Sequence, residues 1–136
     1  MPHMKSVPLS WRTRKSKYSL IGSKCLNCNT IYFPPRQFCQ KCRRRGKLEE
    51  ITLSGLGEIL SFTIIKSAPK GFEKQAPYTI GIIKLDEGPT LSAQIVNSGC
   101  VEIGKKVKMV FRKTYEDGDS GLIHYGFKFE LIDSFL

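Results

Sequence analysis

The 136-residue chain lacks long hydrophobic stretches, a glycine-rich phosphate loop and, apart from two residues, histidine. No apolar run approaches the roughly 20 residues that span a bilayer, so we expect no membrane helix. The N-terminal 24 residues lack the apolar segment of a secretory signal, and their Ser/Lys/Arg-rich composition only faintly resembles a transit peptide. We therefore expect a cytoplasmic globular protein, and a large enzyme and a secreted disulfide scaffold are excluded.

Groups that could perform catalysis are also scarce. A nucleophilic cysteine needs a base, but nothing in the sequence links Cys100 to either histidine, His3 or His124. We expect Cys100 to be a small buried or half-buried thiol and His124 to face solvent from a strand. Five of the 12 acidic residues lie in two turn sequences, 86–87 and 116–119, and we expect them to be turn and solubility residues rather than a matched acid/base pair. The sequence therefore predicts no catalytic residues and a protein that is not an enzyme.

Positive charge is concentrated in the first third of the chain. Residues 1–50 contain 12 Lys and Arg but only 2 acidic residues, whereas residues 51–136 contain 10 of each. The whole net charge of +10 therefore lies in the first third. This asymmetry indicates an anionic partner, although basic side chains could equally serve to solvate a small module and neutralise its thiolates.

Two pairs of cysteines within this basic third form the strongest motif, CxxC-x10-CxxC. Its members are Cys25, Cys28, Cys39 and Cys42. Two such turns provide four thiolates for one tetrahedral ion, which favours structural zinc because no ligand position stays open. Iron of the rubredoxin type has the same ligands and remains an alternative, whereas disulfides and a redox pair are disfavoured.

Short runs with a period of two follow, which is typical of strands. They lie at 59–65, 78–85, 91–95, 106–112 and 123–131. In the first run Leu60, Phe62 and Ile64 share one face, and in the second Ile80 and Ile82 do so. Turn sequences at 86–89 and 116–121 and a longer loop at 66–77 separate the runs. We predict a mainly β fold with a five-stranded OB barrel; a sandwich or an SH3-like barrel is the alternative.

These patterns divide the chain into three parts: a basic docking arm at 1–22, a zinc ribbon at 23–47 and an OB-fold at 48–136. In the arm we expect a short helix near 10–17, with Ser10 as a candidate N-cap. Arg43, Arg44 and Arg45 follow the last cysteine directly. This run is either an anion site or charge compensation for the thiolates beside it.

The order of motifs resembles a zinc-ribbon plus OB-fold family of acyl-CoA-associated proteins. The similar segments are 11–12, 18–28, 33–36, 39–42, 55–63, 76–78, 85–88 and 103–107, which cover nearly the whole chain. Two positions depart from the pattern: Asn29 replaces a common glycine and Gln40 a common proline. The resemblance implies an N-terminal arm, a rubredoxin-like zinc ribbon and an OB barrel, as expected from the residues themselves.

The resemblance also implies a function. Archaeal members are similar to a small subunit that bridges acetoacetyl-CoA thiolase and HMG-CoA synthase at the entry to the mevalonate pathway, without performing the chemistry. We therefore expect a non-catalytic scaffold that binds CoA or acyl-CoA. The candidate contacts, each of which could instead be an ordinary surface or packing residue, are Arg36, Lys66, Lys70, Phe72 and Tyr78. The alternative is a nucleic-acid-binding module, since both domain types use basic grooves and aromatic residues in this way.

Overall fold

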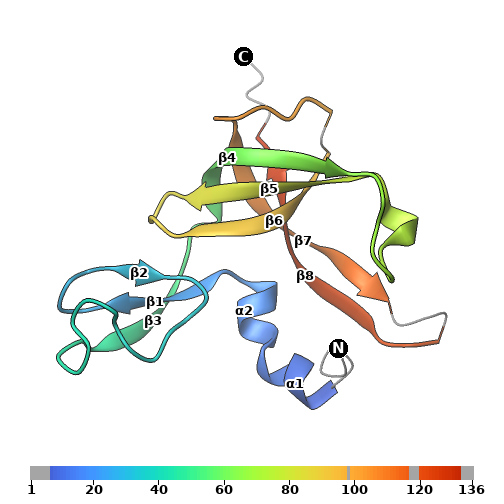
Figure 1. Ribbon diagram of the computed structural model, residues 1–136. Coiled ribbons are helices and arrows are strands. Elements are labelled where there is room, and N and C mark those ends of the chain that lie inside the picture. The colour runs from blue at the N-terminus through green and yellow to red at the C-terminus, as the bar shows by residue number, and fades with distance from the viewer. Residues whose placement is uncertain (1–6, 98, 117–119, 133–136) are drawn as a thin grey trace. The chain divides into compact units, whose positions relative to one another are not determined.

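The computed structural model describes residues 7–97, 99–116 and 120–132, which form two compact units that divide between Leu53 and Ser54 (Figure 1). The first unit contains α1 (Val7–Arg12), α2 (Arg14–Tyr18), β1 (Ile21–Cys25), β2 (Ile31–Tyr32) and β3 (Leu48–Thr52). The second contains β4 (Leu56–Ile65), the 3-10 helix η2 (Glu73–Gln75), β5 (Tyr78–Leu85), β6 (Thr90–Val96), β7 (Lys106–Glu116) and β8 (Ile123–Leu131). No helix in these ranges is long and apolar enough to cross a membrane.

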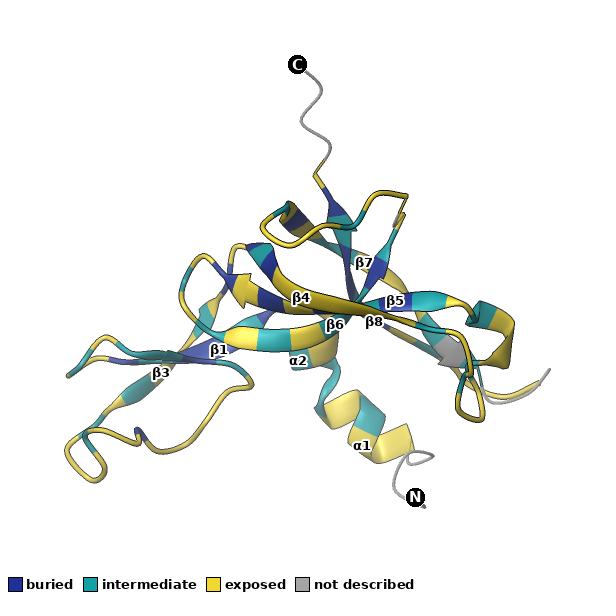
Figure 2. Ribbon diagram, turned by 45° about the horizontal axis from the view of Figure 1, so that its top comes forward, coloured by how far each residue is buried: buried dark blue, intermediate teal, exposed yellow. Residues whose placement is uncertain are grey.

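The N-terminal arm forms two short helices instead of the single helix expected near 10–17. Ser10 lies inside α1, so the prediction that it caps the helix N-terminus is wrong. The helix is interrupted at Thr13, whose hydroxyl donates to the carbonyl of Leu9 at 2.9 Å. Such a bond back to the preceding turn competes with the regular helical ladder. Neither helix contains a buried residue, and in Figure 2 α1 is largely exposed.

The ribbon is a three-stranded antiparallel sheet in the order β2-β1-β3. β1 pairs with β3 from Ile21 opposite Thr52 to Cys25 opposite Leu48. Residues 48–52, placed by sequence reasoning at the start of the barrel, thus pair with the strand that carries the first cysteine. The physical reason is that β3 joins the ribbon by pairing with β1, and the residues of β3 alone do not predict its partner strand.

The second unit is a closed five-stranded barrel in the order β4-β5-β6-β8-β7, which confirms the predicted OB-fold and the mainly β class. β4 pairs with β7 and closes the barrel. β5 and β6 form an antiparallel hairpin whose turn lies at 86–89, as predicted. The 66–77 loop joins β4 to β5, also as predicted, and contains η2. The 116–121 turn lies partly outside the described residues.

The strand faces that are buried in the barrel differ from those that the alternation of apolar residues in the sequence predicted. On β5 the shared face of Ile80 and Ile82 is the more exposed one, with Ile82 45% exposed, while Ile83 is fully buried on the other. On β4 the register shifts between Ile59 and Ser61, so a bulge interrupts the alternation. A bulge inserts one extra residue and moves the following side chains to the opposite face. The sequence period alone could not reveal this shift.

Fully buried side chains from four strands fill the barrel: Ile59, Ile83, Val107 and Phe129 are all 0% exposed. Gly81 makes room for this core, because a Cβ atom at its position would lie 2.5 Å from Cδ1 of Ile95. Cys100 is exposed, so the prediction of a buried or half-buried thiol is wrong. It lies in the connection that leads out of β6, beyond Asn97 with its positive φ of 53°.

Candidate functional site

The four paired cysteines are carried by two similar turns of the ribbon. In the first, the N–H of Asn29 donates to the carbonyl of Cys25 at 2.8 Å, and in the second the N–H of Arg43 donates to that of Cys39 at 2.9 Å. Asn29 and Arg43 have φ of 57° and 51°. Asparagine tolerates this left-handed conformation better than arginine does. Both turns direct their sulfur atoms toward one point.

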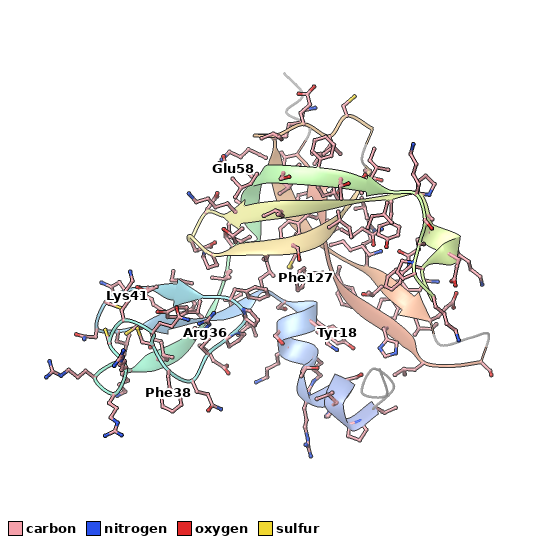
Figure 3. All side chains as sticks on the ribbon, in the orientation of Figure 1. Tyr18, Arg36, Phe38, Lys41, Glu58 and Phe127 are labelled. Atoms are coloured by element: carbon pink, nitrogen blue, oxygen red, sulfur yellow. The ribbon has the colours of Figure 1, made fainter. Side chains whose placement is uncertain are left out.

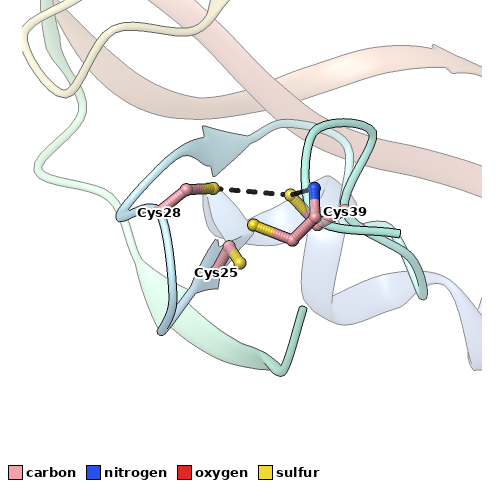
Figure 4. Close-up of side chains that lie close together, drawn as sticks. Cys25, Cys28 and Cys39 are labelled. Carbon is pink, nitrogen blue, oxygen red and sulfur yellow. Dashed lines mark hydrogen bonds between the residues drawn. The ribbon is translucent and has the colours of Figure 1, made fainter. Parts of the chain in front are cut away.

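The thiols gather closely enough to share one ion. The Sγ atoms of Cys25, Cys28, Cys39 and Cys42 all lie within 4.8 Å of one another. Those of Cys28 and Cys39 are 3.5 Å apart (Figure 4). A Zn–S bond of about 2.3 Å in a tetrahedron requires sulfur separations of this order. Cys25 and Cys39 are buried, with exposed fractions of 0% and 1%, and the other two are half-buried.

Hydrogen bonds prepare the sulfur of Cys39 for ionisation. The hydroxyl of Tyr32 lies 3.4 Å from it, and the N–H of Cys42 donates to it at 3.4 Å. Together these contacts, that of Tyr32 first, lower the pKa of Cys39 to about 6. The pKa of Cys42 is raised instead, because the thiol of Cys28 and burial disfavour a second negative charge. Four adjacent sulfurs cannot all ionise without a cation among them, so the donor set fits zinc.

Glycine 46 closes the candidate metal centre from the side of the last turn. A Cβ atom at Gly46 would lie 2.8 Å from Cβ of Cys39 and 3.1 Å from that of Cys42. Only a residue without a side chain allows the backbone to approach both ligands so closely. Sequence reasoning missed Gly46 and Tyr32, although a glycine just after a CxxC pair and a tyrosine inside the spacer were both visible in the sequence.

The predicted ligand contacts are distributed over both units. Lys66, Lys70 and Phe72 lie on the loop between β4 and β5, and Tyr78 begins β5. The rings of Phe72 and Tyr78 have centroids 6.1 Å apart, and both side chains are half-buried. Arg36 belongs to the ribbon unit, where its guanidinium lies 5.2 Å from the ring centroid of Tyr32 (Figure 3).

The helices of the arm expose large apolar side chains among basic ones. Trp11 is 66% exposed, Val7 58% and Tyr18 43%. The guanidinium of Arg14 lies 3.9 Å from the Trp11 ring centroid, which is a cation–π contact. Helices of six and five residues are too short to be stable by themselves. The arm therefore exposes apolar and basic side chains side by side.

The arrangement defines a class of protein: a two-domain chain in which a zinc ribbon precedes an OB barrel. Residues 12–49 match the model of the ChsH2 rubredoxin-like zinc ribbon domain, and residues 50–112 match that of the ChsH2 C-terminal OB-fold domain. Both halves of the architecture are thus shared with this class.

The chain belongs to the DUF35 family of scaffold proteins. It is 51% identical to a DUF35 domain-containing scaffold protein of Methanocaldococcus jannaschii over 96% of this chain and 94% of the relative. A protein with the same description from Methanothermobacter thermautotrophicus is 46% identical over 89% and 92% of the two chains. A solved structure described as the Ltp2-ChsH2(DUF35) aldolase shares the fold, with a TM-score of 0.64, 23% identity and coverage of 90% and 89%.

Proposed function

We propose that this chain is a non-catalytic scaffold subunit that holds a thiolase-type enzyme beside HMG-CoA synthase. The carrying observation is the N-terminal arm, whose two helices bury none of their residues and expose Trp11 and Val7. Ordering such helices costs conformational entropy that only contacts with another surface can offset. Its relatives are named as scaffold proteins, which supports this role.

In this proposal zinc is structural. It is held by Cys25, Cys28, Cys39 and Cys42, and when bound it cross-links the two turns of the ribbon. Residues of the ribbon hold the ligands in place. β1 ends at Cys25 of the first turn, and the hydroxyl of Tyr32 together with the N–H of Cys42 orients the sulfur of Cys39. All four sulfurs are used, so no ligand position is left for a substrate.

The proposed ligand is CoA or acyl-CoA, bound on the barrel by Lys66, Lys70, Phe72 and Tyr78, and Arg36 of the ribbon stays a separate predicted contact. The two lysines are exposed and can attract phosphate groups, and the adjacent rings of Phe72 and Tyr78 offer an apolar wall to a pantetheine chain. Among the described residues neither lysine forms an ion pair. The charge of Lys66 is therefore available to an anionic ligand, whereas that of Lys70 also acts on Glu73, whose pKa it helps to lower.

Co-purification tests the scaffold role. Tagged full-length chain should retain thiolase and synthase from its native source, and Trp11→Ala should weaken this retention at least about tenfold, as expected for an exposed aromatic anchor. Phe38→Ala is the matched control, since Phe38 is 73% exposed on the ribbon. If neither enzyme is retained, or if both variants behave alike, the arm does not dock these enzymes.

Calorimetry with CoA tests the ligand separately. The zinc-loaded wild-type chain should bind CoA, and Phe72→Ala should bind it more weakly. Phe111→Ala, which alters an exposed ring on β7, should bind it as the wild type does. A chain that retains the enzymes but does not bind CoA would keep the scaffold proposal and remove the ligand from it.

Nucleic-acid binding is the second candidate function, and one observation favours it. Arg43, Arg44 and Arg45 are all exposed, and none forms an ion pair among the described residues. A fluorescent single strand titrated at two salt concentrations decides the matter, because phosphate contacts produce a steep salt dependence. Tight binding that is lost at higher salt would favour this function over the scaffold.

A further inference from the structure

One edge of β4 lacks a neighbouring strand over its second half. β4 pairs with β7 only over residues 56–58. Ile59 ends this contact, since its N–H donates to the carbonyl of Lys105 at 3.0 Å and its carbonyl accepts from the N–H of Gly104 at 2.8 Å. Beyond Ile59, no strand within the described ranges pairs with this side of residues 61–65. An open edge of this kind presents backbone N–H and C=O groups to another strand.

The open part of β4 has a sequence that invites such pairing. Residues 60–64 are all exposed, and Leu60, Phe62 and Ile64 are 41%, 37% and 55% exposed (Figure 2). The run 59–65 contains no charged residue, no proline and no glycine. Sheet edges that face water are commonly protected by lysine, proline or inward-pointing charge. None of these protects this edge, so a covering partner would remove a large apolar exposure.

Phe62 and Ile64 lie on the face of β4 that continues the barrel core. Residues directly opposite each other in an antiparallel pair share a face of the sheet. Opposite Phe62 and Ile64 on β5 lie Gly81 and Thr79, and both of these are buried. The two apolar side chains stay exposed because no strand follows at the edge of β4. A further strand there would cover them and remove their apolar surface from water.

We propose that residues 61–65 of β4 pair with the same residues of a second copy of this chain, antiparallel about a two-fold axis at Thr63. The available length sets this register, because the backbone of Ile59 is already bonded and a bulge follows it directly. With Thr63 at the centre, Phe62 of each copy lies opposite Ile64 of the other. Aromatic and β-branched residues are favourable cross-strand partners, and a two-fold contact makes this pair twice.

The distribution of charge favours a second copy over a partner attracted electrostatically. Residues 51–136, which include the barrel, contain ten basic and ten acidic residues, so two barrels meet without net repulsion. A partner attracted by charge is directed to the first third of the chain, which holds the whole excess of +10. The uncharged edge of β4 is instead complementary to itself.

This inference goes beyond the scaffold role, since it concerns an edge of the barrel alone. None of residues 61–65 belongs to the N-terminal arm or to the candidate CoA contacts. Loss of the dimer and failure of the proposed function are therefore separate results.

Sedimentation velocity of the zinc-loaded, full-length chain tests the contact from micromolar to submillimolar concentration. The mass should rise from that of one chain to that of two. Thr63→Lys, at an exposed position, places two ammonium groups opposite each other and should weaken the dimer at least about tenfold. Thr90→Lys adds the same charge at an exposed position of β6 and should change the dissociation constant less than about twofold, as for an isolated surface charge.

Disulfide crosslinking tests the register in a Cys100→Ser background, which removes the exposed native thiol. Two Thr63 residues that face each other have Cα atoms about 4.5–5.5 Å apart, within the span of a disulfide. Thr63→Cys should therefore form a covalent dimer with oxidised glutathione as the oxidant. Ser61→Cys is the matched control on the same exposed edge, because its Cα would lie about 13 Å from that of the other copy.

Several results would overturn the proposal. These are a single-chain mass at every concentration, equal dimerisation of wild type and Thr63→Lys, and crosslinking of Ser61→Cys as fast as that of Thr63→Cys. A wild type that dimerises only after deletion of residues 133–136 would assign the edge to the C-terminal segment instead. A monomeric wild type whose Thr63→Lys variant no longer retains a thiolase would assign it to that enzyme.

Discussion

The two units of this protein are stabilised in different ways. The barrel has an apolar core to which each of the five strands contributes a buried side chain: Ile59, Ile83, Ile95, Val107 and Phe129. In the ribbon, the buried cluster consists of two cysteines and one tyrosine: Cys25, Cys39 and Tyr32. A segment with so little apolar area to bury cannot fold by the hydrophobic effect alone. Metal coordination therefore stabilises the ribbon, whereas burial of apolar side chains stabilises the barrel.

Removing a metal ligand should separate the two units most strongly. In Cys39→Ser, we expect the ribbon resonances of a 15N–1H NMR spectrum to collapse to unfolded positions while those of the barrel stay dispersed. The physical reason is that structural zinc supplies about 10–16 kcal/mol of apparent folding free energy in small zinc peptides. Cys100→Ser is the matched control, because Cys100 is exposed and outside the cluster. A ribbon that stays folded in Cys39→Ser would contradict the comparison.

The reverse experiment deletes part of the barrel core. Phe129→Ala should lower the free energy of unfolding of the barrel by about 3–5 kcal/mol, since it leaves a cavity where a fully buried ring stood. Denaturant titration followed by circular dichroism measures the loss. Phe111→Ala, at a ring that is 51% exposed, should cost less than about 1 kcal/mol. Equal losses in the two variants would show that the core is not where the structure places it.

A smaller effect is expected from Gly46→Ala. The added methyl group would collide with Cβ of Cys39, so the last turn must shift and its sulfurs move away from the ideal geometry. Metal affinity, measured by competition with a chelating dye, should fall by roughly 10- to 100-fold, as for other changes next to a metal's ligands. Gly99→Ala, where a Cβ atom meets nothing within 4 Å, should bind metal normally. Unchanged affinity in Gly46→Ala would mean that the turn yields freely.

The smallest effect concerns acid stability of the barrel. Burial of Glu87 by itself raises its pKa, but the N–H of Ser54, which donates to Oε1 at 2.7 Å, and the Ser54 hydroxyl outweigh burial and leave the pKa lowered. A carboxylate with a lowered folded-state pKa adds stability above its ordinary pKa of about 4.5, and this stability is lost as pH falls through the folded-state value.

Thermal unfolding of the barrel between pH 6 and pH 2.5 therefore distinguishes wild type from Glu87→Gln. We expect the melting temperature of the wild type to fall more steeply below about pH 4.5 than that of the variant. Glu102→Gln is the control, because Glu102 is highly exposed and forms an exposed ion pair with Lys105 at 3.8 Å. Identical slopes in wild type and Glu87→Gln would remove Glu87 from the acid dependence.

The sequence predicted the local features of the fold, namely the cysteine turns and the loops, but not which faces of the strands are buried. The CxxC spacing predicted the sulfur cluster because two residues between cysteines fix a tight turn, which depends only on local geometry. The loop at 66–77 and the turn at 86–89 were predicted from proline, glycine and acidic residues for the same reason. By contrast, the inner faces of β4 and β5 could not be predicted from the sequence, because a bulge in β4 and the closure of the barrel decide which side of a strand is buried.

The contacts of the candidate site and of the barrel divide in the same way. Tyr32 contacts the sulfur of Cys39 from seven residues away, and Lys128 meets Gln75 across 53 residues. The contact of Lys128 with Gln75 leaves no trace in the composition or period of either segment, whereas Tyr32 at least lies inside the cysteine spacer. In the sequence, Lys128 is an ordinary polar residue of an alternating strand. Its burial results from the contact of β8 with Gln75 in the 66–77 loop.

The sequence by itself determined the cysteine cluster, the basic first third and the presence of a small β barrel, since each follows from spacing, charge count or a period of two. Only the tertiary structure decided that β3 belongs to the ribbon, that Ile82 and Cys100 are exposed, and that Lys128 is buried. The physical reason is that burial and pairing are properties of surfaces brought together by the fold, whereas turns and ligand spacings are properties of the local chain.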